Sequence, residues 1–116
     1  MSENKRTVEQ YMEAFRHTDH VRILACLTDD VVWEIPGMVK LHGKEEFDRE
    51  IENPNFTGKP LITVTRLTEE NDVVIAEGSV RTQRNDGVVM NLVFCDVFEM
   101  RGGRIAKLVS YLMEVK

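Results

Sequence analysis

The sequence predicts an α+β domain in which helices come first and a long antiparallel meander of strands follows. Apolar residues in the first 27 positions recur with the period of a helix, whereas those after residue 60 alternate as they do in strands. Two tight turns that contain glycine, at 85–87 and 101–103, join the last strands as hairpins. This order is typical of a fold whose helices cover one face of a curved sheet.

The length of the chain predicts one domain, spanning residues 1–116. At 116 residues and 13.4 kDa the chain is shorter than a typical domain of about 150 residues. Its 42% apolar and 30% charged residues are ordinary values for a globular protein.

Three helices are expected in the first half of the chain. The apolar stripe of the first consists of Val8, Tyr11, Met12 and Phe15. A second, short helix starts after the N-capping residues Thr18 and Asp19 and ends at 28–30. Its apolar residues are Val21, Leu24, Ala25 and Leu27. A third helix, at 44–52, stops before Pro54.

Five strands are expected. A short β-branched and aromatic run at 31–35 is closed by a Pro-Gly turn. The others cover 61–67, 73–84, 88–100 and 105–115. Gly78, inside a long strand, is a plausible place for the sheet to bend.

The turns predict the register of the last three strands, because a three-residue loop that ends in a left-handed glycine fixes which residues face each other. The first turn pairs Arg84 with Val88, Val80 with Leu92, Gly78 with Phe94 and Ala76 with Asp96. The second pairs Phe98 with Ala106, Asp96 with Leu108, Phe94 with Ser110 and Leu92 with Leu112.

Strand alternation then sorts the side chains into two faces. The face assigned to the helices carries Met90, Leu92, Phe94, Asp96, Phe98, Leu108, Ser110 and Leu112. The opposite face carries Ile75, Val93, Cys95, Val97, Val109, Tyr111 and Met113, with Glu77, Arg81, Glu99 and Lys107 interspersed. That outer face is too apolar for water and the helices can cover only one face, so we expect a homodimer through the outer face.

Charge and motif content exclude several classes of function. A net charge of −5 would repel a phosphate backbone, so nucleic acid is not expected as a partner. No nucleotide-binding or nucleophile-elbow motif is present, and the three histidines lack the spacing of a zinc site, so neither cofactor nor metal is expected. Cys26 and Cys95 read as free thiols of a cytoplasmic protein, and no segment is apolar enough to span a membrane.

Asp96 is the anomalous residue of the helix-covered face. Its strand neighbours are apolar, and burial without a partner would raise the pKa of the carboxyl group and favour the neutral acid, which can donate a hydrogen bond. The alternatives are a carboxylate that points to solvent or one that backbone amides satisfy at a bulge.

Three further residues are candidates for a site, each with an ordinary structural explanation. Tyr11 lies on the buried stripe of the first helix, where its hydroxyl needs a partner, yet tyrosines at such positions are commonly core residues. Trp33 and Ile35 share a strand face and could form either a pocket wall or simple packing. His42 precedes the third helix as either an exposed loop residue or a base.

The order of elements, with Tyr11 and the segments Val31–Gly37, Asp96–Phe98 and Gly103–Ile105, resembles the nuclear transport factor 2-like superfamily over nearly the whole chain. Within it the chain is similar to the SnoaL-like and ketosteroid isomerase-like branches. The resemblance implies a cone-shaped roll, also called cystatin-like, in which a curved antiparallel sheet and three N-terminal helices enclose an apolar pocket.

The same resemblance implies roles for named residues. Ketosteroid isomerase uses an Asp base with an oxyanion hole made by a tyrosine and a protonated aspartic acid; Tyr11 and Asp96 match the last two. Ile35, before Pro36, stands where the base would be, so steroid isomerisation by that route is not expected. SnoaL-like cyclases need one aspartate at the position of Asp96 as acid and base, and the Asp-Arg-Asp set of limonene epoxide hydrolase relatives has no clear counterpart.

We therefore expect a small-molecule enzyme of isomerase or cyclase type in which Asp96 exchanges a proton with a lipophilic carbonyl or enol and Tyr11 stabilises charge on oxygen. The expected substrate-binding residues are Trp33, Ile35, His42, Leu92, Phe94, Phe98, Leu108 and Leu112. One alternative is a non-catalytic protein that binds a hydrophobic ligand; another is a dimeric interaction domain whose pocket is filled by Met12, Met90 and Trp33.

Overall fold

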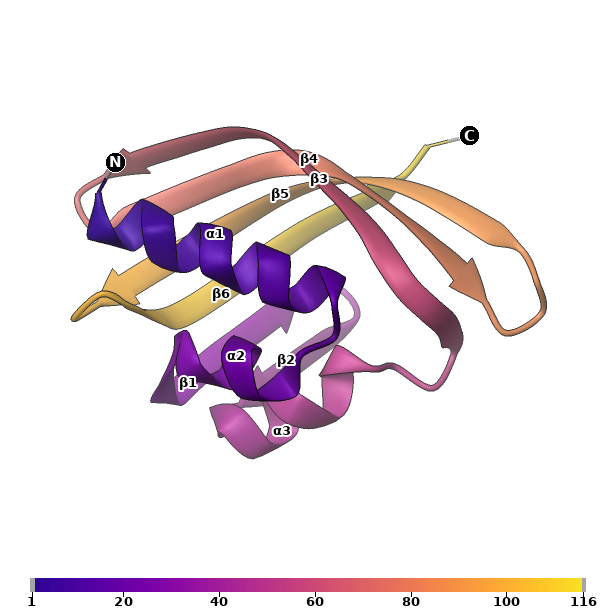
Figure 1. Cartoon of the computed structure of the whole chain (residues 1–116), viewed down its shortest axis with the longest axis horizontal. Coiled ribbons are helices and arrows are strands. Elements are labelled where there is room, and N and C mark those ends of the chain that lie inside the picture. Colours follow the sequence, from indigo (N-terminus) through magenta and orange to yellow (C-terminus); the bar gives the residue numbers. More distant parts are fainter. Residues whose placement is uncertain (1, 116) are drawn as a thin grey trace.

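The computed structural model describes residues 2–115 and shows three helices and one six-stranded sheet over that range (Figure 1). The helices are α1 (Glu3–Arg16), α2 (His20–Ala25) and α3 (Gly43–Ile51). The strands are β1 (Leu27–Ile35), β2 (Val39–His42), β3 (Phe56–Glu70), β4 (Val73–Arg84), β5 (Val89–Arg101) and β6 (Arg104–Glu114). The α+β prediction is confirmed.

The sheet is curved and does not close into a barrel. Its strand order is β2-β1-β6-β5-β4-β3, and every pairing is antiparallel except β1 with β6, which is parallel. This parallel pair was not predicted from the sequence. In Figure 1 the sheet arches over α1, while α2 and α3 lie at the end formed by β1 and β2.

Helix α1 begins and packs as its sequence predicts. The Ser2 hydroxyl caps it by accepting a hydrogen bond from the Lys5 backbone N–H. Val8, Tyr11 and Met12 are buried on its inner stripe. This stripe covers the concave face of the sheet, so burial of apolar surface is the main reason that α1 is stable in its position.

Helix α2 is shorter than predicted. Asp19 caps it through the backbone N–H of Arg22, but the helix ends at Ala25 and β1 begins at Leu27. The prediction of helix through Leu27 is wrong because Leu27 pairs with Ile105 in the sheet, where both side chains are fully buried. Tertiary packing here outweighs local helical periodicity.

Strand β2 was missed by the sequence analysis because its four residues are too few to show a period. It follows a turn in which Gly37 has a φ of +81°, and it pairs with β1 from Val39↔Ile35 to His42↔Val32. Helix α3 then begins at Gly43, one residue before the predicted position.

The first predicted hairpin register is confirmed. Gly87 is left-handed, with a φ of +88°, and β4 pairs with β5 as Ala76↔Asp96, Gly78↔Phe94 and Val80↔Leu92. Glu77 consequently lies opposite Cys95 on the outer face and forms an ion pair with Arg66.

The second register is wrong by two residues. The observed pairs are Phe98↔Leu108, Asp96↔Ser110, Phe94↔Leu112 and Leu92↔Glu114. The turn is a two-residue loop in which Gly102 and Gly103 both have positive φ, and this shorter loop shifts the register by one residue. A bulge at Ala106 shifts it by a second residue, because Ile105 and Lys107 pair with consecutive residues of β5. Because the combined shift is even, the predicted assignment of side chains to faces is nevertheless correct.

No helix of residues 2–115 is long and apolar enough to cross a membrane.

Gly78 shapes the sheet at the wall of the concave face. A Cβ atom at this position would clash with the carbonyl oxygen of Thr63 on β3 and would stand 2.9 Å from the ring of Phe94 on β5. The position opposite Gly78 on β3 is Val64, directly before a register shift in the β3–β4 ladder. The absent side chain therefore allows β3 and the Phe94 ring to approach β4 closely.

We predict that Gly78→Ala destabilises the fold by about 2 kcal/mol or more, because the added methyl group has no space beside a backbone oxygen. Urea unfolding monitored by Trp33 fluorescence measures this change. Ser79→Ala, at the exposed neighbouring position, is the matched control and should change the free energy of unfolding by less than about 0.5 kcal/mol. Equal stability of Gly78→Ala and the unchanged chain would contradict the account.

Candidate functional site

A small cavity of about 100 Å³ lies between α1 and the concave face of the sheet. Its lining comes from one helix and five strands: Met12, Phe15, Trp33, Ile62, Val80, Phe94, Asp96, Ser110 and Leu112. Seven of these side chains are apolar. Asp96 and Ser110 bring the only carboxyl and hydroxyl groups in the lining, so chemistry in this cavity is centred on them.

A larger hollow, of about 780 Å³, runs between α1 and β3 on the outside of the molecule. Charged side chains dominate its lining, and they include Arg16 and Arg66, which are paired with Glu13 and Glu77. Paired surface charges are solvated and have ordinary structural roles. The smaller cavity is the candidate site because it contains a buried ionisable group.

Asp96 occupies the inner face of β5 and is only 9% exposed. Its ladder neighbours are Ala76 on β4 and Ser110 on β6. Within residues 2–115, the Oδ1 atom of Asp96 has no hydrogen-bond partner. Burial raises the pKa of this carboxyl group from its ordinary value of 3.8 to about 7, and the neighbouring Ser110 hydroxyl offsets part of that rise.

Ser110 is the ladder partner of Asp96 and a hydrogen-bond partner of Trp33. The indole Nε1–H of Trp33 donates a hydrogen bond of 3.0 Å to the Ser110 hydroxyl oxygen, and this bond is buried. Trp33 itself stacks on Phe47 of α3, with ring centroids 4.6 Å apart and planes inclined by 27°. A polar side chain at the cavity is thus held by an aromatic residue that packing fixes in place.

Tyr11 is buried at 3% exposure in an aromatic cluster next to the cavity. Its ring lies 5.5 Å from Phe98, 5.7 Å from Phe15 and 6.3 Å from Phe47, measured between centroids. Burial, and secondly the charge of Asp96, raise the pKa of the Tyr11 phenol well above its ordinary value. Tyr11 is therefore a neutral phenol at any physiological pH, although it is not part of the cavity lining.

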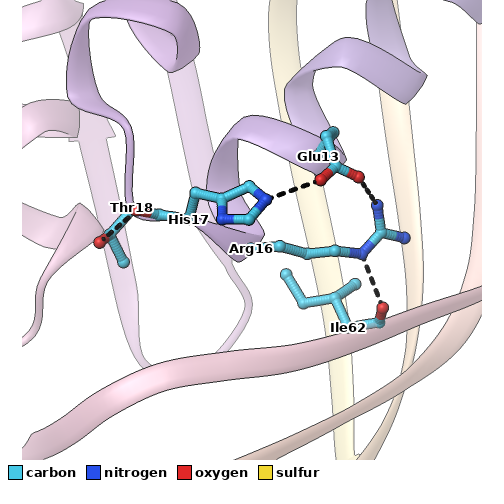
Figure 2. A network of polar contacts seen from close by, with 5 residues as sticks. All are labelled: Glu13, Arg16, His17, Thr18 and Ile62. Carbon is cyan, nitrogen blue, oxygen red and sulfur yellow. Dashed lines mark hydrogen bonds and ion pairs between the residues drawn. The ribbon is translucent and has the colours of Figure 1, made fainter.

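Arg16 joins the end of α1 to β3 (Figure 2). Its Nε–H donates to the backbone carbonyl of Ile62 at 2.8 Å, and its Nη1 lies 3.0 Å from Glu13. The other carboxylate oxygen of Glu13 lies 2.8 Å from the His17 ring. Because the Ile62 side chain lines the cavity, this contact holds one cavity wall against the helix.

The structure brings together four of the residues that the sequence analysis proposed for the site. Asp96, Trp33, Phe94 and Leu112 line the cavity. Four others are buried in the core without lining it, namely Tyr11, Ile35, Phe98 and Leu108. Leu92 is half-buried further along β5, where it faces Glu114. His42 is exposed at the N-terminus of α3 and, like Glu77, is outside the lining.

Sequence reasoning gave no site role to Phe15, Ile62, Val80 and Ser110. Phe15 could have been found, because it shares the helical stripe of Tyr11. Val80 could also have been found from the confirmed β4–β5 register. Ser110 was placed opposite Phe94 by the register error, which concealed its contact with Asp96.

Cys26 and Cys95 are free thiols. No group of three or more His, Cys, Asp or Glu side chains in the part of the chain that the structure describes could hold a metal ion.

Solved structures with the same fold cover nearly the whole chain. One is a nuclear transport factor 2-like protein of unknown function from Burkholderia pseudomallei K96243, with a TM-score of 0.89, 24% identity and coverage of 97% of this chain and 92% of that one. An LEH-like epoxide hydrolase from M. tuberculosis has a TM-score of 0.83, 22% identity and coverage of 96% of this chain and 83% of that one. TerC, co-crystallised with polyporic acid, has a TM-score of 0.87, 20% identity and coverage of 97% and 92%.

No curated protein matches the sequence. The sequence model of the SnoaL-like domain, however, matches residues 8–108, which include most of α1, the aromatic cluster, Asp96 and most of the sheet. The similar structures share the α+β architecture with a curved, open sheet. The chain belongs to the SnoaL-like domain family and has the fold of a nuclear transport factor 2-like protein.

Proposed function

We propose that this protein is a small-molecule enzyme of isomerase or cyclase type, in which Asp96 transfers a proton to and from a lipophilic carbonyl or enol substrate. The observation that carries the proposal is a carboxyl group with an unpartnered oxygen in an apolar cavity and a pKa of about 7. A group with a pKa near the working pH is populated in both forms, so it can act as both base and acid.

One group suffices for such chemistry. As a carboxylate, Asp96 removes a proton from the carbon next to a carbonyl, which leaves an enolate and a neutral acid. The acid then returns the same proton to a different carbon of the delocalised anion, or to its oxygen, so that atoms and charge balance without an oxidant. Ile35 at the position of the family's base agrees with a mechanism in which Asp96 performs both transfers.

The cavity limits the reacting part of the substrate to a compact group. Its volume of about 100 Å³ is well below the 300–1,000 Å³ or so of typical ligand pockets. Leu112 in the lining is 39% exposed, so the cavity opens to solvent on that side. A substrate larger than a single ring would extend out through this opening.

Tyr11 has a supporting role beside Asp96 in the proposed mechanism. Tyr11 lies close enough to Asp96 for the carboxylate charge to raise the pKa of the phenol, but a small movement must bring the hydroxyl to the cavity. We therefore assign Tyr11 to stabilisation of negative charge on the substrate oxygen and give proton transfer to Asp96 alone.

A non-catalytic binding protein is the second candidate. The absence of a second proton-transfer residue in the described cavity lining favours it, because Asp96 could simply anchor one polar atom of a hydrophobic ligand. An open cavity beside Asp96 favours an enzyme or a binding protein over an interaction domain with a filled interior. Two proteins of similar fold, an epoxide hydrolase and a protein crystallised with polyporic acid, are consistent with small organic ligands.

We also propose that a second copy covers the outer face of the sheet. Val93, Tyr111 and Met113 lie there at 43%, 54% and 68% exposure, beside a shallow hollow over β4, β5 and β6. Adjacent apolar side chains with this exposure are typical of an interface.

Asp96→Asn should abolish turnover without unfolding the chain. Candidate ketones are first selected by thermal shift, and turnover is then measured by NMR as conversion of the ketone to its isomer. We expect a loss of about a hundredfold or more, the usual contribution of an acid-base group. Tyr11→Phe should lose less. Glu77→Gln, the same change on the outer face, is the control; equal rates for it and for Asp96→Asn would argue against the proposal.

The raised pKa of Asp96 predicts how stability depends on pH. Between about pH 4 and pH 7 the folded chain retains a proton at Asp96 that the unfolded chain has released, so the free energy of unfolding should fall as pH rises. The slope is on the order of 1 kcal/mol per pH unit and should level off above about pH 7. Urea titrations of the unchanged chain and of Asp96→Asn, compared at each pH, isolate this contribution; parallel curves would contradict it.

Sedimentation at micromolar concentration should show a species of twice 13.4 kDa. Tyr111→Glu introduces a charge into the proposed interface and should give the 13.4 kDa monomer, because two unpaired carboxylates would be buried per dimer. Lys107→Glu, on the same face but nearer the opposite end of β6, controls for charge alone. A monomer for the unchanged chain would rule out the interface.

A further inference from the structure

We propose that His20 is the centre of a pH-sensitive clasp, formed with Asp48 and Glu52, that holds α3 against α2 while the histidine ring is protonated. Loss of the proton breaks one of the two contacts and releases the end of α3. None of the three residues lines the cavity, so the clasp goes beyond the proposed function and does not depend on it.

The ring of His20, the first residue of α2, contacts two carboxylates of the neighbouring helix. Its Nδ1 lies 2.6 Å from Oδ1 of Asp48, and its Nε2 lies 2.5 Å from Oε2 of Glu52. Figure 1 shows α2 beside α3, the helix that these two acids belong to or directly follow. Within residues 2–115, no other side-chain hydrogen bond or ion pair joins α2 to α3, so the clasp is their polar link.

Both contacts are hydrogen bonds only when the ring is protonated. An ionised carboxylate is an acceptor only, so each ring nitrogen must carry a hydrogen. The neutral ring has one N–H and one bare nitrogen, and the bare nitrogen would face a carboxylate oxygen, so one bond is lost. The hydrogen bonds with Asp48 and then with Glu52 raise the pKa of His20 above its ordinary value of 6.5. The clasp is therefore closed below that raised pKa and opens as the pH rises through it.

The end of α3 is electrostatically unfavourable without this cation. Asp48 and Glu52 are like charges four residues apart, which face each other on a helix surface. They also lie at the C-terminus of α3, where the unpaired carbonyl groups favour positive charge. A protonated His20 between the two carboxylates offsets both effects, whereas a neutral ring leaves the repulsion in place.

The charged side chains at the end of α1, at the start of β1 and in the rest of α3 are bound to partners other than His20. These groups are Glu13 with Arg16 and His17, Asp29 with Lys44, Asp30 with Arg101, Glu45 with Arg49, Glu46 with the His42 backbone, and Glu50 with Asn53. On α2 itself, Asp19 caps the backbone N–H of Arg22. Asp48 and Glu52 therefore set the charge of the His20 ring.

Helix α3 supports one wall of the cavity. Phe47, the residue before Asp48, is fully buried and stacks on Trp33 with ring centroids 4.6 Å apart. Trp33 in turn lines the cavity. Release of α3 from α2 would loosen the support behind Trp33, so the clasp makes the firmness of that wall depend on pH.

Hydrogen–deuterium exchange of the α3 amides at pH 5.5 and pH 8.5 tests the clasp. The full chain carries Asp96→Asn, because titration of Asp96 would otherwise change stability in the same direction. The side chains of His20, Asp48 and Glu52 are 34%, 42% and 62% exposed, so the effect is that of a solvated ion pair. We expect the protection factors of α3 to be about two- to fivefold lower at pH 8.5 than at pH 5.5.

His20→Gln in the same background should give the lower protection at both pH values. His17→Gln is the matched control, because His17 contacts Glu13 of its own helix; it should leave the pH dependence of α3 intact. An equal pH dependence in His20→Gln and in its parent chain overturns the proposal.

A direct titration of the His20 ring by NMR provides a second measurement that leaves the chain unchanged. The pKa of His20 should lie above 6.5, and Asp48→Asn and Glu52→Gln should each lower it, because each removes one carboxylate from the clasp. A pKa at or below 6.5 in the unchanged chain contradicts the clasp. Neither measurement uses a substrate, so their outcome is independent of the proposed function of Asp96.

Discussion

The burial of one carboxyl group on an apolar sheet face is the constraint on which the rest of the site depends. Asp96 is held there by the β-ladder on both sides, not by a charge partner, so its neutral form is set by the lack of water around it. The apolar stripe of α1 and the close approach of Phe94 to Gly78 keep water out. Sheet curvature and helix packing therefore both determine the protonation state of the carboxyl group.

Much of the fold was predictable because its signals are local. The helical stripe of α1, the length of β4 and the left-handed glycine of the first hairpin are all visible in short stretches of sequence. The four-residue β2 and the early start of β1 were not predictable, because both depend on partners distant in the sequence. The parallel pairing of β1 with β6 also joins residues distant in the sequence, so it was not predictable either.

The candidate site was likewise predictable where the signal is local and not where it depends on distant partners. That Asp96 faces inward follows from strand alternation, which survives a register error of two residues. The identity of its partner on β6 does not follow from strand alternation. A two-residue turn at Gly102 and a bulge at Ala106 place Ser110 beside the carboxyl in place of the predicted Leu108. Two small features of one hairpin thus decide whether Asp96 has an apolar or a hydroxyl neighbour, and the sequence pattern around the turn is compatible with either loop length.

A hydroxyl neighbour changes what a buried acid can do. With leucine alongside, burial alone would act on the pKa. With Ser110 alongside, the rise in pKa is partly offset. A buried acid with a strongly raised pKa would be permanently protonated and a poor base, whereas one near 7 exchanges its proton in both directions. The reversibility that a single-residue mechanism needs therefore depends on the same serine that the bulge brings into place.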